Sequence, residues 1–265
     1  MIRVKNMSFD YYNTNVLQNI NLTINKNDKV LLVGHNGAGK STLIRLLAGL
    51  HNTFNYEEFE VIGRRSPMDQ FHGLVYLGNR WIRNLAFVGS TPYVADIKVE
   101  NMMVKLQEKY SGRRDELIEV LGVDLEWKMH KISDGERKKV QIMLALLKPF
   151  KLVLIDEFIS ELDILVRDRL FTYLNKEKAT ILYATHVFDD IDKWITHVVY
   201  LSNGTCESKV SLKDFLQGDT IYNRVKEKLL VDRHKMMHID DNFINLGPQG
   251  GWGSGRSSNI VYPTI

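Results

Sequence analysis

A glycine-rich stretch near the start of the chain has the residues that can bind phosphate. It fits the pattern GxxxxGK(S/T), in which backbone N–H groups surround the phosphates, the lysine reaches the β and γ oxygens, and the hydroxyl binds Mg²⁺. Glycine is needed because side chains would keep the backbone away from the anion. We predict that the phosphates of a nucleotide are bound here by Gly34, His35, Asn36, Gly37, Ala38, Gly39, Lys40, Ser41 and Thr42. The motif alone does not name the nucleotide or the activity, because GTPases, kinases and ATPases share it.

Two adjacent carboxylates, Asp156 and Glu157, follow the apolar run 152–155. Parallel α/β sheets bind ligands at the carboxyl ends of their strands. Neighbouring side chains on a strand point to opposite sides, so Asp156 can face the metal of a nucleotide while Glu157 polarises an attacking water. An apolar run followed by two acids is usually a solvated strand end, and the phosphate loop is what favours the functional interpretation.

Strands and helices alternate around these two motifs. The continuous apolar run 30–33 predicts a central parallel strand, and leucines at helical spacing after the glycine loop predict a helix. Alternation before residue 25 predicts edge strands. The alternating order predicts a parallel α/β core. Further strands are expected at 59–62, 74–77, 151–158, 180–184 and 197–201, and helices at 99–110, 115–121, 136–147, 164–175 and 221–237.

Composition indicates a folded globular chain. Of 265 residues, 44% are hydrophobic and 25% charged, which suits one large domain or two modest ones. The net charge of +3 is too small to predict nucleic-acid binding, and the short basic runs are expected to be solvated. Cys206, the single cysteine, cannot form an internal disulfide. With no apolar run long enough to span a membrane, we expect a cytoplasmic protein without membrane insertion.

The segment Ile132-Ser133-Asp134-Gly135-Glu136-Arg137 precedes a predicted helix. It resembles the LSGGQ signature of ABC ATPases, with Asp134 in place of a glycine and Glu136 in place of the glutamine. A serine-capped helix start can offer N–H and hydroxyl groups to a γ-phosphate. Read in isolation, the segment is an ordinary capped helix. The resemblance implies that Ser133, Gly135 and Glu136 contribute to ATP binding.

Further pieces follow in the order of an ABC ATPase. Residues 160–163 resemble its D-loop, His186 its switch histidine and 201–204 its final hairpin, while Tyr11 matches the aromatic that stacks on adenine. The resemblance implies an α/β, ABC-type P-loop ATPase fold. It would have a RecA-like mixed or parallel sheet, antiparallel edge strands and an inserted α-helical subdomain at about 91–148. We expect this ATPase domain to span 1–218 and a C-terminal extension to span 219–265.

A closer resemblance rests on the stretches 126–141, 146–150 and 183–189. They resemble the ABC ATPases associated with the CCR-NOT transcription complex, a group without a membrane domain, whose signature also carries Ser-Asp-Gly. The Gly-Trp and Gly-Arg tail at 251–256 is similar to the ending of their plant relatives. Glu136, where those relatives mostly have Gln, is a departure of this chain. This resemblance implies regulation of transcription or mRNA metabolism, with a nuclear location as well as a cytoplasmic one.

Most ABC ATPases also have a glutamine that binds Mg²⁺ and couples to a membrane partner. Here the expected position falls on Asn79 or, in another alignment, on Ser90. We predict that Mg²⁺ is held by Ser41 and Asp156 with Asn79, and that coupling to a transport domain is weakened or absent.

The resemblance implies a mechanism in which two chains form a head-to-tail homodimer with ATP between them. Lys40, Glu157 and His186 would act on the γ-phosphate as cation, general base and sensor. Closure on ATP and opening after hydrolysis would make the protein a switch. Two other readings stay open. The chain could be the ATP-binding subunit of a transporter whose membrane subunit is a separate chain, or an ATP-gated scaffold in which turnover hardly matters.

Overall fold

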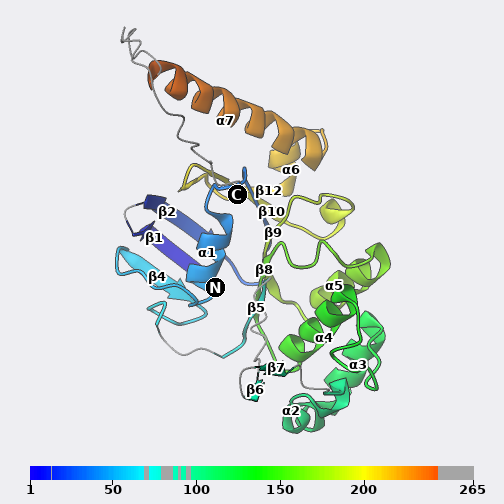
Figure 1. Cartoon of the computed structure of the whole chain (residues 1–265). Coiled ribbons are helices and arrows are strands. Elements are labelled where there is room, and N and C mark those ends of the chain that lie inside the picture. The colour runs from blue at the N-terminus through cyan, green and yellow to red at the C-terminus, as the bar shows by residue number, and fades with distance from the viewer. Residues whose placement is uncertain (13, 69–71, 79–85, 89–90, 94–96, 244–265) are drawn as a thin grey trace, which may run out of the picture.

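The computed structural model describes residues 1–12, 14–68, 72–78, 86–88, 91–93 and 97–243. The strands and helices that carry the sequence motifs all lie within these ranges (Figure 1). Asn79, Ser90 and the tail 247–256 lie outside the described residues, and so do the side chains of residues 86–93 and 234–243.

The central sheet has the strand order β11-β10-β3-β9-β8-β5, and β12 also pairs with β10. From β10 to β5 every pair is parallel. All side chains of β8 and β9 are buried, as continuous apolar runs require when both faces of a parallel sheet are covered. The predicted parallel α/β core is therefore confirmed. The strands are β3 (Lys29–Val33), β5 (Leu74–Gly78), β8 (Leu152–Asp156), β9 (Thr180–Ala184), β10 (His197–Ser202), β11 (Thr205–Cys206) and β12 (Val210–Ser211).

An antiparallel sheet of β1 (Ile2–Tyr11), β2 (Thr14–Ile24) and β4 (Glu58–Val61) packs on one face of the central sheet. Helix α1 (Lys40–Leu47) lies between the two sheets and shares a core with both (Figure 1). The strands predicted from alternation before residue 25 are therefore present, but they form this separate antiparallel sheet and not the edge of the central one. Buried leucine and isoleucine side chains of α1 fix the helix, and with it the loop that enters it.

The other face of the central sheet is covered by α3 (Ser111–Leu121), α4 (Asp134–Leu146) and α5 (Ile164–Lys176) (Figure 1). The region 91–148 is not helical from its start, because β7 (Thr91–Tyr93) pairs with β6 (Ala86–Val88). The predicted helix 99–110 is also interrupted. A 3₁₀ turn, η1 (Val99–Asn101), and α2 (Val104–Lys109) are separated at Met103, whose φ is 51°.

The physical reason for this break is the Gln107 side chain. Its amide donates to the carbonyl oxygens of Val99 and Glu100 at 2.9 and 3.3 Å and also to that of Met102. Only 2% of Gln107 is exposed, so these buried carbonyls are satisfied without a continuous helix.

The chain continues through the 3₁₀ turn η2 (Ile191–Lys193) to β10, and after β12 through α6 (Leu212–Leu216) to α7 (Ile221–Phe243). The structure thus has the predicted terminal helix, which ends at Phe243 rather than at residue 237. The Tyr200 hydroxyl of β10 donates to the Asp232 carboxylate at 2.7 Å, which ties α7 to the sheet. Across the described residues, no helix has both the length and the apolar character that crossing a membrane needs.

Candidate nucleotide site

The glycine loop joins the end of β3 to the start of α1, in the strand, loop and helix context that the motif requires. At two of its positions, Gly34 and Gly39, the neighbouring chain leaves no room for a side chain. A Cβ on Gly34 would lie 2.1 Å from the Leu201 carbonyl oxygen, and one on Gly39 would lie 2.7 Å from Leu17 Cδ2. Gly39 also has a φ of 102°, which side chains disfavour. The loop is therefore held against β10 and β2.

Lys40 is buried inside this loop, with 6% of its surface exposed. Its ammonium donates to the carbonyl oxygens of Gly34 and His35 at 2.9 and 3.1 Å. Burial lowers the pKa of Lys40, which the nearby Glu157 and Asp156 carboxylates partly oppose. A bound anion would favour the charged ammonium, so the loop presents a cation that phosphate stabilises.

A hollow of about 360 Å³ opens over the loop. Backbone and side chains of the loop form one wall, and Val16 of β2 and Glu157 form another. This brings the predicted residues Asn36, Gly37, Gly39, Lys40, Ser41 and Thr42 together around one space.

The His35 side chain does not line the hollow; it links the loop to the turn at Asn203. Its Nε2 lies 3.0 Å from Asn203 Oδ1, and its Nδ1 lies 2.7 Å from the Asn36 carbonyl oxygen. In addition, the Gly204 N–H donates to the Ala38 carbonyl oxygen at 3.2 Å. The hairpin at 201–204 is thus the turn between β10 and β11, and it supports the phosphate loop.

Ser41 and Asp156 meet, although they lie far apart in the sequence. The Ser41 hydroxyl donates to Asp156 Oδ1 at 2.6 Å. A hydroxyl beside a carboxylate is a hard oxygen donor set that fits Mg²⁺, which takes its other ligands from water and phosphate. In the described part of the chain no group of three or more His, Cys, Asp or Glu side chains forms a metal site, so a magnesium ion would depend on those further ligands.

Two residues that the sequence did not single out hold the other oxygen of Asp156. The Tyr76 hydroxyl donates to Oδ2 at 3.4 Å, and an Arg45 guanidinium nitrogen lies 3.7 Å from it. Asp156 is only 5% exposed, so these partners offset the cost of burying its charge. Arg45 lies one helical turn after Ser41 and therefore on the same face of α1, which is the one signal that could have indicated it.

Glu157 and His186 also meet, at the ends of neighbouring strands. His186 Nε2 lies 2.9 Å from Glu157 Oε1, and the Glu157 N–H donates to the Ala184 carbonyl oxygen at 2.9 Å. Glu157 has a φ of 54°, which ends the strand at Asp156, two residues before the predicted end. This turn separates the two carboxylates: Asp156 is buried toward Ser41 and Glu157 faces the hollow. Burial and the nearby Lys40 lower the pKa of His186, while Glu157 raises it.

The segment that resembles the D-loop follows directly. The Ser160 hydroxyl donates to the Glu157 carbonyl oxygen at 2.7 Å, and Asp163 caps α5 by accepting from the Val166 N–H at 2.9 Å. The first bond closes the turn after Glu157, and the second caps the start of α5.

Ser133 caps α4, as the sequence predicted, and forms a capping box with Glu136. The Ser133 N–H and hydroxyl both donate to Glu136 Oε2 at 2.8 Å, and the Glu136 N–H donates to the Ser133 hydroxyl oxygen at 3.3 Å. These hydrogen bonds to Ser133 lower the pKa of Glu136. A Cβ on Gly135 would meet no atom within 4 Å. The signature residues Ser133, Gly135 and Glu136 are not among those that line the hollow.

Tyr11 lies at the end of β1. Its hydroxyl is 2.8 Å from His51 Nε2, and its ring makes an edge contact with Phe9 at 4.8 Å between centroids. Its neighbour Tyr12 is fully exposed. Asn79, the third predicted metal ligand, lies outside the described residues.

A hydroxyl and a carboxylate beside a glycine loop with a buried lysine define a P-loop nucleotide site. Comparison with known proteins places the chain within that class. The family model described as "ABC transporter" matches residues 17–160. The chain belongs to this family, and the domain is an ATPase.

Among curated relatives, the chain is 43% identical over 198 residues to ABC transporter I family member 20 of Arabidopsis thaliana. That match covers 71% of the chain and 60% of the relative, so the chain spans less than two thirds of that protein's length. It is also 31% identical to CCR4-associated factor 16 of Saccharomyces cerevisiae, covering 84% of the chain and 82% of the relative.

Two solved structures share the fold. The ATP-binding subunit of an ABC transporter superposes with a TM-score of 0.70 at 24% identity, over 87% of this chain and 99% of that one. A dimeric ATP-binding cassette in a post-hydrolysis state, bound to ADP and Pi, superposes with a TM-score of 0.63 at 20% identity, over 80% and 99%. The predicted ABC-type α/β fold is therefore confirmed.

Proposed function

We propose that the chain hydrolyses ATP as a head-to-tail homodimer in which each nucleotide lies between the phosphate loop of one copy and the signature helix of the other. The observation that carries this proposal is the position of Gly135. It lies at an open helix start, away from the hollow, where no atom of its own chain approaches its missing side chain. A second copy would bring a phosphate to this surface.

In this proposal the phosphate loop binds the triphosphate through its N–H groups, and Lys40 leaves its carbonyl partners to neutralise the β and γ oxygens. Glu157 would take the proton of the attacking water, and His186, whose Nε2 lies 2.9 Å from Glu157 Oε1, would donate to the γ-phosphate. Ser41 and Asp156 would hold Mg²⁺, which when bound stabilises charge on the phosphates. Tyr11 would stack on adenine, and Asn79 would be a further metal ligand.

We further propose that the ATPase acts on a separate chain, the membrane subunit of a transporter. This reading has more support than a role in transcription, because the matched family and the relatives in plants are described as transporters. The CCR4-associated relative in yeast supports the second candidate, a switch in a CCR-NOT-type complex with cytoplasmic and nuclear locations.

Phosphate release by purified protein tests the catalytic assignment. We expect Glu157→Gln to lower kcat by about 100-fold or more, as loss of a general base does, while ATP still binds. Glu207→Gln is the matched control, since that carboxylate pairs with Lys228 on α7, away from the hollow. If Glu157→Gln retained the parent rate, Glu157 would not be the base.

Cell fractionation tests the partner. A transporter subunit should sediment with membranes and crosslink to a membrane protein when the Glu157→Gln variant is held closed by ATP. Recovery in the soluble fraction with CCR-NOT subunits would contradict the transporter reading and support the second candidate.

A further inference from the structure

Arg45 is a cation beside the phosphate loop that the proposed mechanism does not use. It lies in α1, one helical turn after Ser41, and its side chain is half-buried. Its Nη2 lies 3.7 Å from Asp156 Oδ2, while the Ser41 hydroxyl donates to the other oxygen, Oδ1. Within the described residues no other carboxylate pairs with Arg45, and its buried Nε has no hydrogen-bond partner. The charge of Arg45 is therefore directed at Asp156.

Tyr76 holds the same oxygen of Asp156 from the neighbouring strand. Its hydroxyl donates to Oδ2 at 3.4 Å, and burial raises the pKa of Tyr76, so the hydroxyl remains a donor. Gly78, two residues further along β5, pairs in register with Asp156. A Cβ on Gly78 would lie 2.1 Å from the Tyr76 hydroxyl oxygen. The missing side chain of Gly78 therefore gives Tyr76 the room to reach Asp156.

Four charged side chains surround the place where a divalent cation would bind. Asp156 and Glu157 are anionic, and Lys40 and Arg45 are cationic. Burial lowers the pKa of Lys40, and the charges of Glu157 and Asp156 raise it. Arginine stays ionised in proteins, so the charge of Arg45 is permanent. The formal charges of the four side chains cancel, and a divalent cation beside Asp156 is repelled by Arg45.

We propose that Arg45 acts through Asp156 as a positioning residue, which keeps the Ser41–Asp156 pair from retaining a divalent cation until a nucleotide supplies negative charge. The charge of a triphosphate would outweigh the repulsion by the guanidinium, and its oxygens would add the ligands that the pair lacks. Metal and nucleotide would then bind together. The part of the nucleotide rests on the function proposed above, whereas the effect of Arg45 on metal affinity does not.

Binding of Mn²⁺ to the nucleotide-free protein, measured by electron paramagnetic resonance, tests this proposal. Mn²⁺ is the probe because it takes the same oxygen ligands as Mg²⁺. Arg45→Met removes the charge and keeps an unbranched side chain, and it should bind Mn²⁺ at least about tenfold more tightly than the parent. Arg45→Gln should show the same gain, so the answer does not depend on one variant. Arg45→Lys keeps the charge and should stay within about threefold of the parent.

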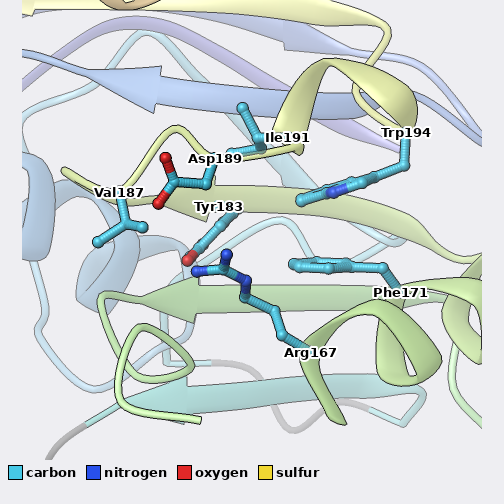
Figure 2. A pocket seen from close by; sticks show the side chains of 7 residues that line it. All are labelled: Arg167, Phe171, Tyr183, Val187, Asp189, Ile191 and Trp194. Atoms are coloured by element: carbon cyan, nitrogen blue, oxygen red, sulfur yellow. The ribbon is translucent and has the colours of Figure 1, made fainter. Parts of the chain in front are cut away.

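Arg167→Met is the matched control. Arg167 is also half-buried, but it extends from α5 beside Tyr183 and Phe171, on the face of the central sheet opposite to α1 (Figure 2). Its loss removes the same charge from the chain and should leave the Mn²⁺ affinity unchanged. Tyr76→Phe removes a neutral donor from Asp156 and should therefore raise the affinity much less than Arg45→Met does.

Adding Asp156→Asn to Arg45→Met should abolish the gain, because the cation then loses its carboxylate ligand. The proposal is overturned if Arg45→Met binds Mn²⁺ no more tightly than Arg167→Met, or if the gain survives Asp156→Asn. An equal gain in Tyr76→Phe would also overturn it, because hydrogen bonding and not charge would then control the affinity. If the parent had no ATPase activity, the proposed function would fail, yet the Mn²⁺ affinities would still decide the role of Arg45.

Discussion

The phosphate loop and the signature helix use glycine for different reasons. Gly34 and Gly39 have no room for a side chain, because their own chain approaches within 2.1 and 2.7 Å of where a Cβ would lie. Gly135 has open space around it. The first two glycines are therefore required by the fold, whereas nothing in the fold requires the third. If activity requires Gly135, we infer that a second molecule contacts the helix start at this position.

The same contrast holds for the charged groups. Asp156, Lys40 and Glu157 all have partners inside the chain, at the edge of one hollow. The start of α4 satisfies its own donors through the capping box and faces outward. In the proposed mechanism, the first region supplies most of one half-site, and the second would act only against another copy.

The largest effect is expected for Lys40→Ala. The variant removes the buried cation of the half-site, and loss of one preorganised charge costs about 100- to 1000-fold in rate. ATP affinity and phosphate release measured together should both fall. Normal ATP binding by Lys40→Ala would show that the loop does not hold the phosphates as described.

Gly34→Ala should be the next largest change, and it acts on stability. Its methyl group would meet the Leu201 carbonyl of β10, and overpacking of this kind costs about 1 to 3 kcal/mol. Chemical denaturation monitored by circular dichroism measures it. A stability equal to that of the parent would mean that the loop can move away from β10.

Ser133→Ala should cost about 1 kcal/mol, the usual value of a helix cap. Chemical denaturation of Ser133→Ala and of Glu136→Gln separates the contribution of the cap from that of the carboxylate charge. Ser133→Ala removes the capping side chain, whereas glutamine at position 136 removes the charge but can still complete the capping box. Glu136→Gln should therefore change stability by less than about 0.5 kcal/mol. Equal losses in both variants would mean that the carboxylate charge, and not the cap, stabilises the start of α4.

Gly135→Ala should change stability with the opposite sign to Gly34→Ala. An alanine inside a helix is up to about 1 kcal/mol more favourable than glycine, and here its methyl group meets nothing. Denaturation of both variants under one condition makes the comparison. A loss of stability in Gly135→Ala would contradict the claim that the fold does not require this glycine.

The sequence predicted those parts of the molecule that local patterns determine. Continuous apolar runs indicated the parallel strands, and the spacing of glycine, lysine and serine indicated the loop. The Ser133 cap was equally visible. These features depend on residues that are close in the chain, so a sequence shows them directly.

Features that depend on distant contacts were missed. Arg45 and Tyr76 hold Asp156, but Tyr76 reaches it only because β5 pairs with β8. The break at Met103 depends on Gln107 turning back onto three carbonyls, which hydrophobic spacing cannot indicate.

The mass of Glu157→Gln in solution, measured by light scattering with and without ATP, tests the central claim most directly. We predict a monomer without nucleotide and a dimer with ATP, and a monomer under both conditions when Gly135→Asp is added, although the double variant still binds ATP. A dimer that forms with ATP despite Gly135→Asp, or no dimer in either protein, would contradict a site shared between two chains.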